Sequence, residues 1–436
     1  MKRVMMSAML GAIVGGSTVS AQENDRATTP DGLPKAFEMA VRDGRLAVFG
    51  PGEHAGNAWG SVCLASIGPA DGGGVSIRQT YLFWQPRYFY PASTVKLYAA
   101  IAAYEQMNAM ARMYPDADLS EKTPLRIHPL FEGETVREID PTRERSAFPF
   151  GDPPITIEHE AHKIFVISDN DAFNTLYDFV GQRDLNRRVR SWGTQATMVL
   201  HRLSVGWTEE ENRLAPMIDL GLSPGSPQIG ERRSTLEHFG TDTMWMSEVS
   251  MTLGTGFIRS GELVQEPFDF NGKNFTLLKD LQFVLAKLLF PKIANWFFET
   301  GDGGWLGPTS GRPLDLTDAQ RAQLIASATM YPRESESPRY DPAEYPDDHA
   351  KFLLPGLLRV RPLEEWRVVN KIGLAYGFVT ENAYVEHRPT GHAVFVAAVI
   401  HRNPNGIYND NQYDYATTLA EMATLGEVVG RALVGD

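Results

Sequence analysis

The sequence contains a single cysteine, Cys63, among 436 residues, so no disulfide can form within the chain. Its ten histidines include no His-x-x-x-His or His-Glu-x-x-His pair, the spacings that place two zinc ligands on one face of a helix. These absences exclude a disulfide-stapled domain and argue against a zinc hydrolase. We therefore expect no metal and no other cofactor.

Positive charge is also scarce. Lys and Arg together number 41 against 54 Asp and Glu, which gives a formal net charge of −13. A chain this acidic repels the phosphate backbone of DNA and RNA. We therefore expect no nucleic-acid partner.

The sequence has no long uninterrupted apolar run, because its two main apolar stretches are short or broken by charged residues and proline. The run 5–19 falls short of the ~20 apolar residues that span a bilayer. A second apolar stretch, 277–298, contains charged residues and a proline, so we expect a buried helix pair there. No stable membrane insertion is expected from either stretch.

The first apolar run has the flanks of a secretory signal. Lys2 and Arg3 precede it, and the small residues Val19-Ser20-Ala21 end it. This order of basic, apolar and small residues is what signal peptidase substrates share. We interpret residues 1–21 as a cleaved signal peptide and expect an exported protein, periplasmic or secreted.

Strand patterns lie at both ends of the chain, and helical patterns lie between them. Two strands flank a Gly-rich turn near the N-terminus, and three more precede a C-terminal helix. This order predicts an α+β fold in which the N- and C-terminal segments form one antiparallel sheet flanked by helices. An all-helical domain would be inserted into it, with the active site between the two. We place the sheet domain at 33–85 plus 360–436 and the helical domain, with insertions, at 86–359.

Pro91-Ala92-Ser93-Thr94-Val95-Lys96 places a serine and a lysine three residues apart, on one face of a helix. Ser93 would stand near the helix N-terminus, where free N–H groups and the dipole favour a developing anion. The apolar residues that follow would bury Lys96. A desolvated ammonium loses proton affinity, so Lys96 could accept the Ser93 proton. The structural alternative is an N-cap serine beside a surface lysine.

Two further polar motifs follow in the sequence. Ser168-Asp169-Asn170 separates two apolar runs, so it is expected at a helix break facing a cleft, or as an ordinary N-cap. Lys371-Ile372-Gly373 ends a predicted strand, where the lysine can supply a fixed charge and the glycine lets backbone approach a ligand. Each of the three motifs is common by itself, so a function is indicated only by all three together in this order.

In this order the three motifs resemble the Ser-x-x-Lys, Ser-Asp-Asn and Lys-Thr-Gly set of class A β-lactamases and penicillin-binding proteins. The likeness extends to 155–181 around the second motif and to 239–264, which resembles the next helical segment of that family. Extra segments at 126–154 and 265–312 interrupt it. The chain is thus similar to a divergent member of the serine β-lactamase-like superfamily, closest to class A.

The resemblance implies catalytic roles for the matching residues. Ser93 would be the nucleophile that becomes acylated, and Lys96 the adjacent base or proton shuttle. Ser168 would relay a proton to the leaving nitrogen, while Asp169 would be structural.

The resemblance also implies substrate-binding roles. Asn170 would bind the side-chain amide of the substrate, and Lys371 would supply positive potential near the nucleophile. Gly373 would admit the ligand, and the backbone N–H groups of Ser93 and Leu374 would form an oxyanion hole.

Two positions depart from the family pattern. Ile372 stands where the family carries Thr or Ser, whose hydroxyl helps to hold the substrate carboxylate; Arg388 and Arg402 are candidates to replace that contact. No glutamate has the family's spacing to Asn212, so the deacylation base is not fixed by the pattern. Glu209 is our candidate for that base, and a solvated acidic loop is the alternative.

We therefore expect an exported serine hydrolase that acts on a small-molecule β-lactam or a peptidoglycan-derived substrate through an acyl-enzyme at Ser93. Hydrolysis of the β-lactamase type is favoured. A penicillin-binding D-Ala-D-Ala peptidase, which would keep its adduct, and another amidase or esterase are the enzymatic alternatives. A non-catalytic binder or sensor of cell-wall fragments is the alternative from a different class, and the retention of Lys96 and Ser168 favours catalysis over it.

Overall fold

The computed structural model describes ten segments of the chain, and the expected signal peptide at 1–21 lies outside them. Within the described segments, every helix is too short or too polar to cross a bilayer. The segments are 27–51, 57–71, 73–83, 87–140, 146–147, 153–194, 196–235, 249–299, 305–306 and 311–435.

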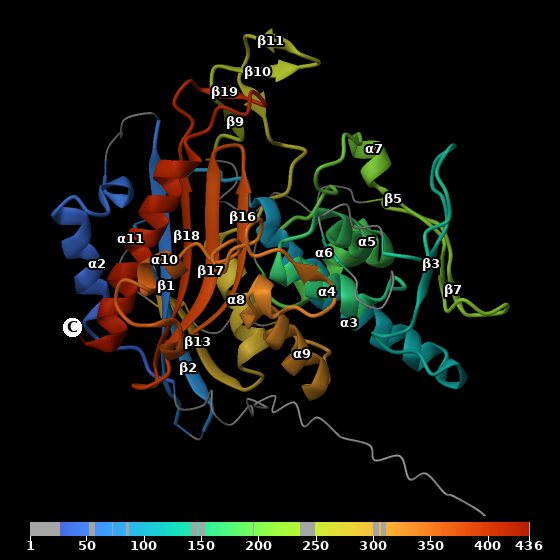
Figure 1. Ribbon diagram of the computed structural model, residues 1–436, viewed down its shortest axis with the longest axis horizontal. Helices are drawn as coiled ribbons and strands as arrows, with labels where there is room; N and C mark the ends of the chain where they lie inside the picture. Colours follow the sequence, from blue (N-terminus) through green and yellow to red (C-terminus); the bar gives the residue numbers. More distant parts are fainter. Residues whose placement is uncertain are drawn as a thin grey trace, which may run out of the picture.

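A sheet of seven described strands, in the order β14-β13-β2-β1-β18-β17-β16, divides the molecule (Figure 1). Neighbouring strands run antiparallel, except that β13 and β2 are parallel. The N-terminal hairpin is therefore joined directly to the three C-terminal strands. The strands are β1 (Trp59–Pro69), β2 (Val75–Phe83), β13 (Ile293–Glu299), β14 (Trp305–Leu306), β16 (Trp366–Ala375), β17 (Phe378–His387) and β18 (His392–His401).

Helices cover both faces of this sheet, because its central strands are apolar on both sides. One apolar core lies between the sheet and α2 (Leu33–Arg42), α10 (Leu354–Leu357) and α11 (Tyr415–Val434). The other, larger core lies between the sheet and the helical body. That body contains α3 (Lys96–Met113), α4 (Ile157–Val166), α5 (Asn170–Val180), α6 (Gln182–Ser191), α8 (Leu278–Leu289) and α9 (Asp318–Thr329).

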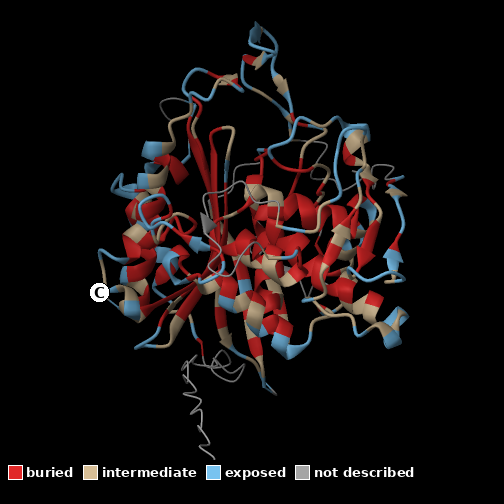
Figure 2. Cartoon of the chain, turned by 45° about the vertical axis from the view of Figure 1, so that its right-hand side comes forward, coloured by how far each residue is buried: buried red, intermediate tan, exposed pale blue. Residues whose placement is uncertain are grey.

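Helix α3 is the central element of the helical body. Its first ten residues are all buried, so it has no solvent face there. Figure 2 shows that buried residues fill the interior of the molecule. The 3-10 turn η2 (Ala92–Val95) leads into α3 and packs against the edge strand β16. The start of α3 therefore lies where the helical body meets the sheet.

Short elements complete the described structure. They are the strands β3 (Leu125–Ile127), β4 (Ser146–Ala147), β5 (Leu214–Ala215), β6 (Ile218–Leu220), β7 (Gln228–Ile229), β8 (Arg232–Arg233), β9 (Thr252–Leu253), β10 (Gly256–Arg259), β11 (Glu262–Val264), β12 (Phe268–Asp269), β15 (Arg339–Tyr340) and β19 (Ile407–Tyr408), the helix α7 (Glu209–Asn212), and the turns η1 (Ala47–Phe49), η3 (Pro115–Ala117), η4 (Pro332–Glu334) and η5 (Leu363–Glu365).

The predicted α+β class is confirmed, because strands from both ends of the chain form the main sheet and helices lie between them in sequence. The inserted region also carries short strands, so it is not all-helical. The boundaries assigned to the two domains stay predictions.

Two local expectations were wrong. The stretch 277–298 is one helix, α8, followed by the strand β13, which pairs with β2. Pro291 separates them, and the β-branched and aromatic residues after it favour a strand. Within the described part of 239–264, residues 252–264 are strands rather than helix. Ser260 and Gly261 have φ of 53° and 85°, which turns the chain between β10 and β11.

Gly356 tests how tightly α10 packs on α11. A Cβ at this position would lie 1.7 Å from the carbonyl oxygen of Ala423 in α11, a backbone atom that cannot move alone. We expect Gly356→Ala to lower the free energy of unfolding by about 1–3 kcal/mol, because the two helices must separate. Urea denaturation measures the change.

The matched control is Gly32→Ala, where no atom lies within 4 Å of the added Cβ. We expect this variant to stay within about 0.5 kcal/mol of the parent. Equal stabilities for the two variants would contradict the packing described here.

Candidate active site

Ser93 lies in the turn η2, between the end of β2 and the start of α3. Ala92 before it has φ of 47°, a left-handed conformation that costs a residue with a Cβ of order 1 kcal/mol or more. Thr94 Oγ1 donates to the Pro91 carbonyl at 2.7 Å and closes the turn. Ala92 and Thr94 are buried while Ser93 is half-buried. The turn therefore presents the Ser93 side chain and hides its neighbours.

Lys96 is fully buried at the start of α3. Its Nζ donates to Asn170 Oδ1 at 2.6 Å and to the Ser168 carbonyl oxygen, and it lies 3.4 Å from Ser168 Oγ. These contacts join the first motif to the second. A buried amine with polar partners of this kind can hold or release a proton without leaving its place.

Lys371 reaches the same serine from the sheet. It is 1% exposed, and its Nζ donates to Ser168 Oγ at 2.7 Å and to the Ile372 carbonyl at 3.1 Å. Burial, reinforced by the nearby Lys96, holds the pKa of Lys371 well below its usual value. The hydroxyl of Ser168 thus stands between two buried amines.

The loop between α4 and α5 carries Ser168 in a strained conformation, with φ of 63°. The next residue, Asp169, is the N-cap of α5, and its carboxylate accepts from the Ala172 N–H at 2.8 Å. Asn170 begins α5, and its Nδ2 donates to Ser204 Oγ at 2.9 Å. The second motif is therefore both a helix cap and part of the polar network.

Gly373 fits the third motif against the nucleophile turn. A Cβ at this position would lie 2.4 Å from the Pro91 carbonyl oxygen and 3.2 Å from the backbone nitrogen of Ser93. Only glycine lets β16 approach this closely. Leu374 follows with a side chain 36% exposed. The close approach brings the backbone of β16 beside Ser93, and the oxyanion role of the Ser93 and Leu374 N–H groups stays a prediction.

The arginines considered as substitutes for the missing hydroxyl are engaged elsewhere. Arg402 pairs with Glu421 at 2.6 Å, and Arg388 Nε donates to the Trp366 carbonyl at 3.2 Å. Ile372 itself is 6% exposed and packs in the apolar core on the α11 face of the sheet. The third motif thus supplies the Lys371 amine and a backbone that approaches the Ser93 turn closely at Gly373. The side chain of Ile372 packs in the core instead of facing the site.

Glu209 lies apart from this network. It begins α7 and lines a cavity of about 190 Å³, where its carboxylate packs against Gly272 and faces the partly buried Lys273. The described lining of that cavity contains neither Ser93 nor Lys96. The structure therefore brings six predicted positions together and places the proposed deacylation base in the wall of a cavity whose described lining includes none of the six. The six are Ser93, Lys96, Ser168, Asn170, Lys371 and Gly373.

Ser204 is a contact of the site that the sequence interpretation missed. It is exposed, has φ of 56°, and accepts the Asn170 amide. Its loop is held to α5 by Arg202, whose guanidinium donates to Asp178 at 2.9 and 2.6 Å and lies over the Trp207 ring. Arg202 and Asp178 are 24 residues apart, so no local pattern indicates their pairing.

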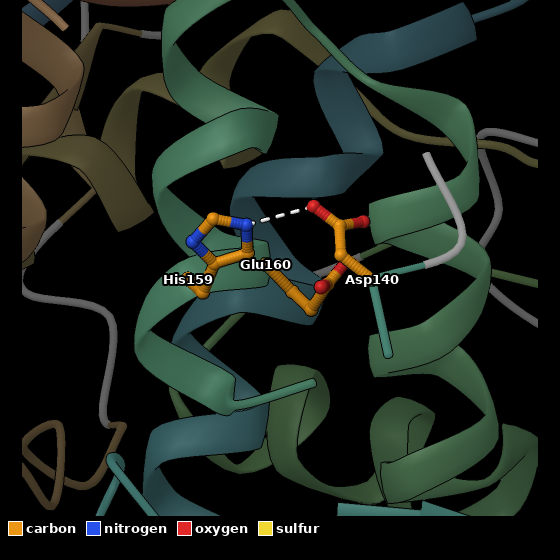
Figure 3. Close-up of side chains that lie close together, drawn as sticks. All are labelled: Asp140, His159 and Glu160. Atoms are coloured by element: carbon orange, nitrogen blue, oxygen red, sulfur yellow. Dashed lines mark hydrogen bonds and ion pairs between the residues drawn. The ribbon is translucent and has the colours of Figure 1, made fainter. Parts of the chain in front are cut away.

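Three side chains of the kinds that bind metal ions, Asp140, His159 and Glu160, lie close together near the second motif (Figure 3). Lys163 is fully buried among them; its Nζ contacts Asp140 and lies 3.1 Å from Glu160. A metal ion would therefore have to share this space with an ammonium. We interpret the group as an ion-pair cluster that supports the strained loop, because the Lys163 carbonyl accepts from the Asp169 N–H at 3.4 Å.

Comparison with known families gives one match to the sequence. A family model described as the Beta-lactamase enzyme family matches residues 81–225, about a third of the chain. The matched segment contains Ser93, Lys96, Ser168 and Asn170, whereas Lys371 lies beyond it. The predicted resemblance to this family is confirmed for these residues. No curated protein matches the sequence.

Several solved structures resemble the chain distantly. The β-lactamase of Sphaerobacter thermophilus is 15% identical, with a TM-score of 0.41 over 92% of this chain and 95% of that one. A class A β-lactamase representative from Bacteroides cellulosilyticus is 13% identical, with a TM-score of 0.46 over 94% and 99%. A mutant of PBP-A, solved as an acyl-enzyme complex with penicillin G, is 14% identical, with a TM-score of 0.44 over 93% and 97%. Similarity at this level does not transfer an activity or a substrate.

The capping role of Asp169 is open to a stability test. Asp169→Ala removes the acceptor of the Ala172 N–H, so we expect a loss of about 1 kcal/mol in the free energy of unfolding. Asp169→Asn keeps a cap oxygen but loses the charge that faces Lys163, so it should lie between the alanine variant and the parent. Urea denaturation separates the three proteins, and an alanine variant as stable as the parent would contradict the role.

Proposed function

We propose that this protein is a serine hydrolase that forms an acyl-enzyme at Ser93 and hydrolyses a β-lactam or a related amide. The observation that carries the proposal is that two buried lysines, Lys96 and Lys371, both lie at the hydroxyl of Ser168. Lys96 directly follows the turn that presents Ser93. The match of residues 81–225 to a β-lactamase enzyme family supports it. A purely structural N-cap serine would not need two buried amines nearby.

In the proposed acylation step, Lys96 and Ser168 carry the protons. As the bond from Ser93 Oγ to the carbonyl carbon forms, a neutral Lys96 takes the hydroxyl proton. As the C–N bond breaks, Ser168 gives its proton to the leaving nitrogen and is reprotonated by Lys96, whose Nζ lies 3.4 Å from Ser168 Oγ. One proton thus moves from Ser93 to the leaving nitrogen. General acid–base steps of this kind contribute typically about 10²–10⁴-fold to rate.

Electrostatic repulsion gives different roles to the two lysines that lie at the Ser168 hydroxyl. Two ammonium groups buried side by side repel each other, so the stable arrangement has one neutral amine and one ammonium. Lys371 donates to Ser168 Oγ at 2.7 Å, which orients the hydroxyl proton away from Lys371. We assign the base to Lys96, which stands three residues from Ser93, and the orienting cation to Lys371, whose charge burial and Lys96 oppose.

A penicillin-binding peptidase that keeps its adduct is the second candidate. The observation that favours it is the position of Glu209 in the wall of a cavity whose described lining lacks Ser93 and Lys96, while the hydroxyl of Ser204 accepts from the Asn170 amide. Without a carboxylate to activate water, an acyl-enzyme would persist. Substrates in this case would be peptidoglycan-derived peptides, with β-lactams as slow-leaving inhibitors.

We further propose that the protein is exported, on the strength of the basic, apolar and small residues in 1–21. N-terminal sequencing of the protein expressed at full length in a Gram-negative host tests this. A periplasmic product that begins at Gln22 would support export, and a cytoplasmic product that keeps Met1 would contradict it.

Ser93→Ala tests the proposed nucleophile. The parent protein should be labelled by a fluorescent penicillin or turn over a chromogenic cephalosporin. The variant should do neither, because the attacking oxygen is gone. Intact mass measures the adduct, and absorbance measures turnover. Ser66→Ala, which removes a hydroxyl bonded only locally to the Arg78 carbonyl, is the control and should behave as the parent.

The two candidates give different results with the parent protein. Turnover without an accumulating adduct supports the hydrolase, and a lasting adduct supports the penicillin-binding candidate. If neither reagent reacts with the parent, both β-lactam interpretations are wrong. An amidase or esterase with another substrate and a non-catalytic binder of cell-wall fragments are then the alternatives that remain.

A further inference from the structure

Another buried lysine, Lys351, and a buried glutamate, Glu381, lie behind the site, on the opposite face of the main sheet. Side chains alternate along β16, so Asn370 points away from the face on which Lys371 meets Ser168. There Asn370 meets Glu381 of β17, which is fully buried, and Lys351, which is 3% exposed. The mechanism proposed above uses neither of these charged groups.

Hydrogen bonds tie the three side chains into one unit. The Asn370 amide donates to Glu381 Oε1 at 2.6 Å, and its carbonyl oxygen accepts from Lys351 Nζ at 2.8 Å. Glu381 Oε2 accepts from the Phe352 N–H at 2.7 Å, and Lys351 also donates to the Ala328 carbonyl at 2.9 Å. Asn370 therefore bridges a buried carboxylate and a buried ammonium immediately before Lys371.

The charges around Lys371 come from every element packed against it. Lys96 approaches from α3, Glu381 from β17 and Lys351 from the segment before α10. The acidic groups near the second motif, Asp140, Glu160 and Asp169, face Lys163. Glu381 is therefore the buried anion that acts on Lys371 from the sheet.

The two groups behind the sheet act on Lys371 with opposite sign. The Glu381 carboxylate favours the ammonium form of Lys371, whereas Lys351 disfavours it. Burial raises the pKa of Glu381 to about 7, so its carboxylate is charged above that pH. Burial also lowers the pKa of Lys351 to about 8.

We propose that Glu381 is a positioning residue of this site, which maintains the positive charge on Lys371 from the opposite face of the sheet while Lys351 opposes it. The inference rests on the proposed function, because the charge on Lys371 matters when Ser168 transfers a proton. Glu381 would touch no substrate, yet it would control the pH range in which the site works.

The test is the pH dependence of the second-order rate constant for acylation by a fluorescent penicillin. Its alkaline limb should follow the loss of the Lys371 proton. Glu381→Gln removes the attracting carboxylate, so the limb should move to lower pH, by on the order of one unit. Lys351→Met removes a repelling ammonium, so the limb should move to higher pH. A role in stability alone would lower rates or stability without shifts of opposite sign.

Two further variants complete the set. Glu381→Asp keeps the charge and should restore the limb toward that of the parent. Glu386→Gln, in the same strand but partly exposed, should leave the limb unchanged. Unchanged limbs in both Glu381→Gln and Lys351→Met, or shifts in the same direction, would overturn the inference.

A second measurement separates this inference from the proposed function. The ¹³Cε resonance of Lys371, assigned by its loss in Lys371→Met, reports the titration of that amine without any substrate. The same opposite shifts are expected there for Glu381→Gln and Lys351→Met. If the parent is never acylated but these shifts occur, the proposed function fails and the electrostatic coupling stands; if the resonance titrates alike in all three proteins, the coupling is wrong.

Discussion

The constraint on which the site depends is the burial of two lysine amines against one serine hydroxyl. Taking an ammonium out of water costs several kcal/mol unless polar partners replace the solvent. The fold supplies those partners: the Ser168 and Ile372 carbonyls, the Asn170 side chain and the Ser168 hydroxyl itself. Two amines beside one hydroxyl make their proton affinities interdependent. That interdependence is the chemical property from which the proposed proton transfers follow.

Each of the three motifs reaches this point from a different part of the fold. The left-handed conformation of Ala92 sets the turn before α3, the left-handed conformation of Ser168 sets the break between α4 and α5, and Gly373 lets β16 approach the turn closely. Backbone strain of this kind persists only where the surroundings hold it in place. Here those surroundings are the two apolar cores and the ion-pair cluster around Lys163.

Much of this arrangement could be predicted from the sequence, because the motif residues carry their chemistry in their types and order. Lys96 and Lys371 are far apart in the chain, yet both were expected beside Ser93.

Other features depend on tertiary pairing that leaves no local pattern. The strand β13 pairs with β2 although the apolar run that contains it reads as helix, and Arg202 meets Asp178 across 24 residues. Glu209 was chosen from an acidic run near Asn212 in which no glutamate has the family's spacing, and the path of the loop decides where it lies. The bridge from Glu381 through Asn370 to Lys351 joins three segments that are separate in the sequence, so no local pattern indicates it.

The central claim is that the two lysines and Ser168 act on Ser93 as one unit, and a double-mutant cycle on acylation tests it most directly. Second-order acylation rate constants would be measured for the parent, Ser168→Ala, Lys371→Met and the double variant. If the residues act together, the double variant should be little slower than the slower single variant, with a coupling of about 1–3 kcal/mol in activation free energy. Losses that simply multiply would show that Ser168 and Lys371 act independently and would contradict the claim.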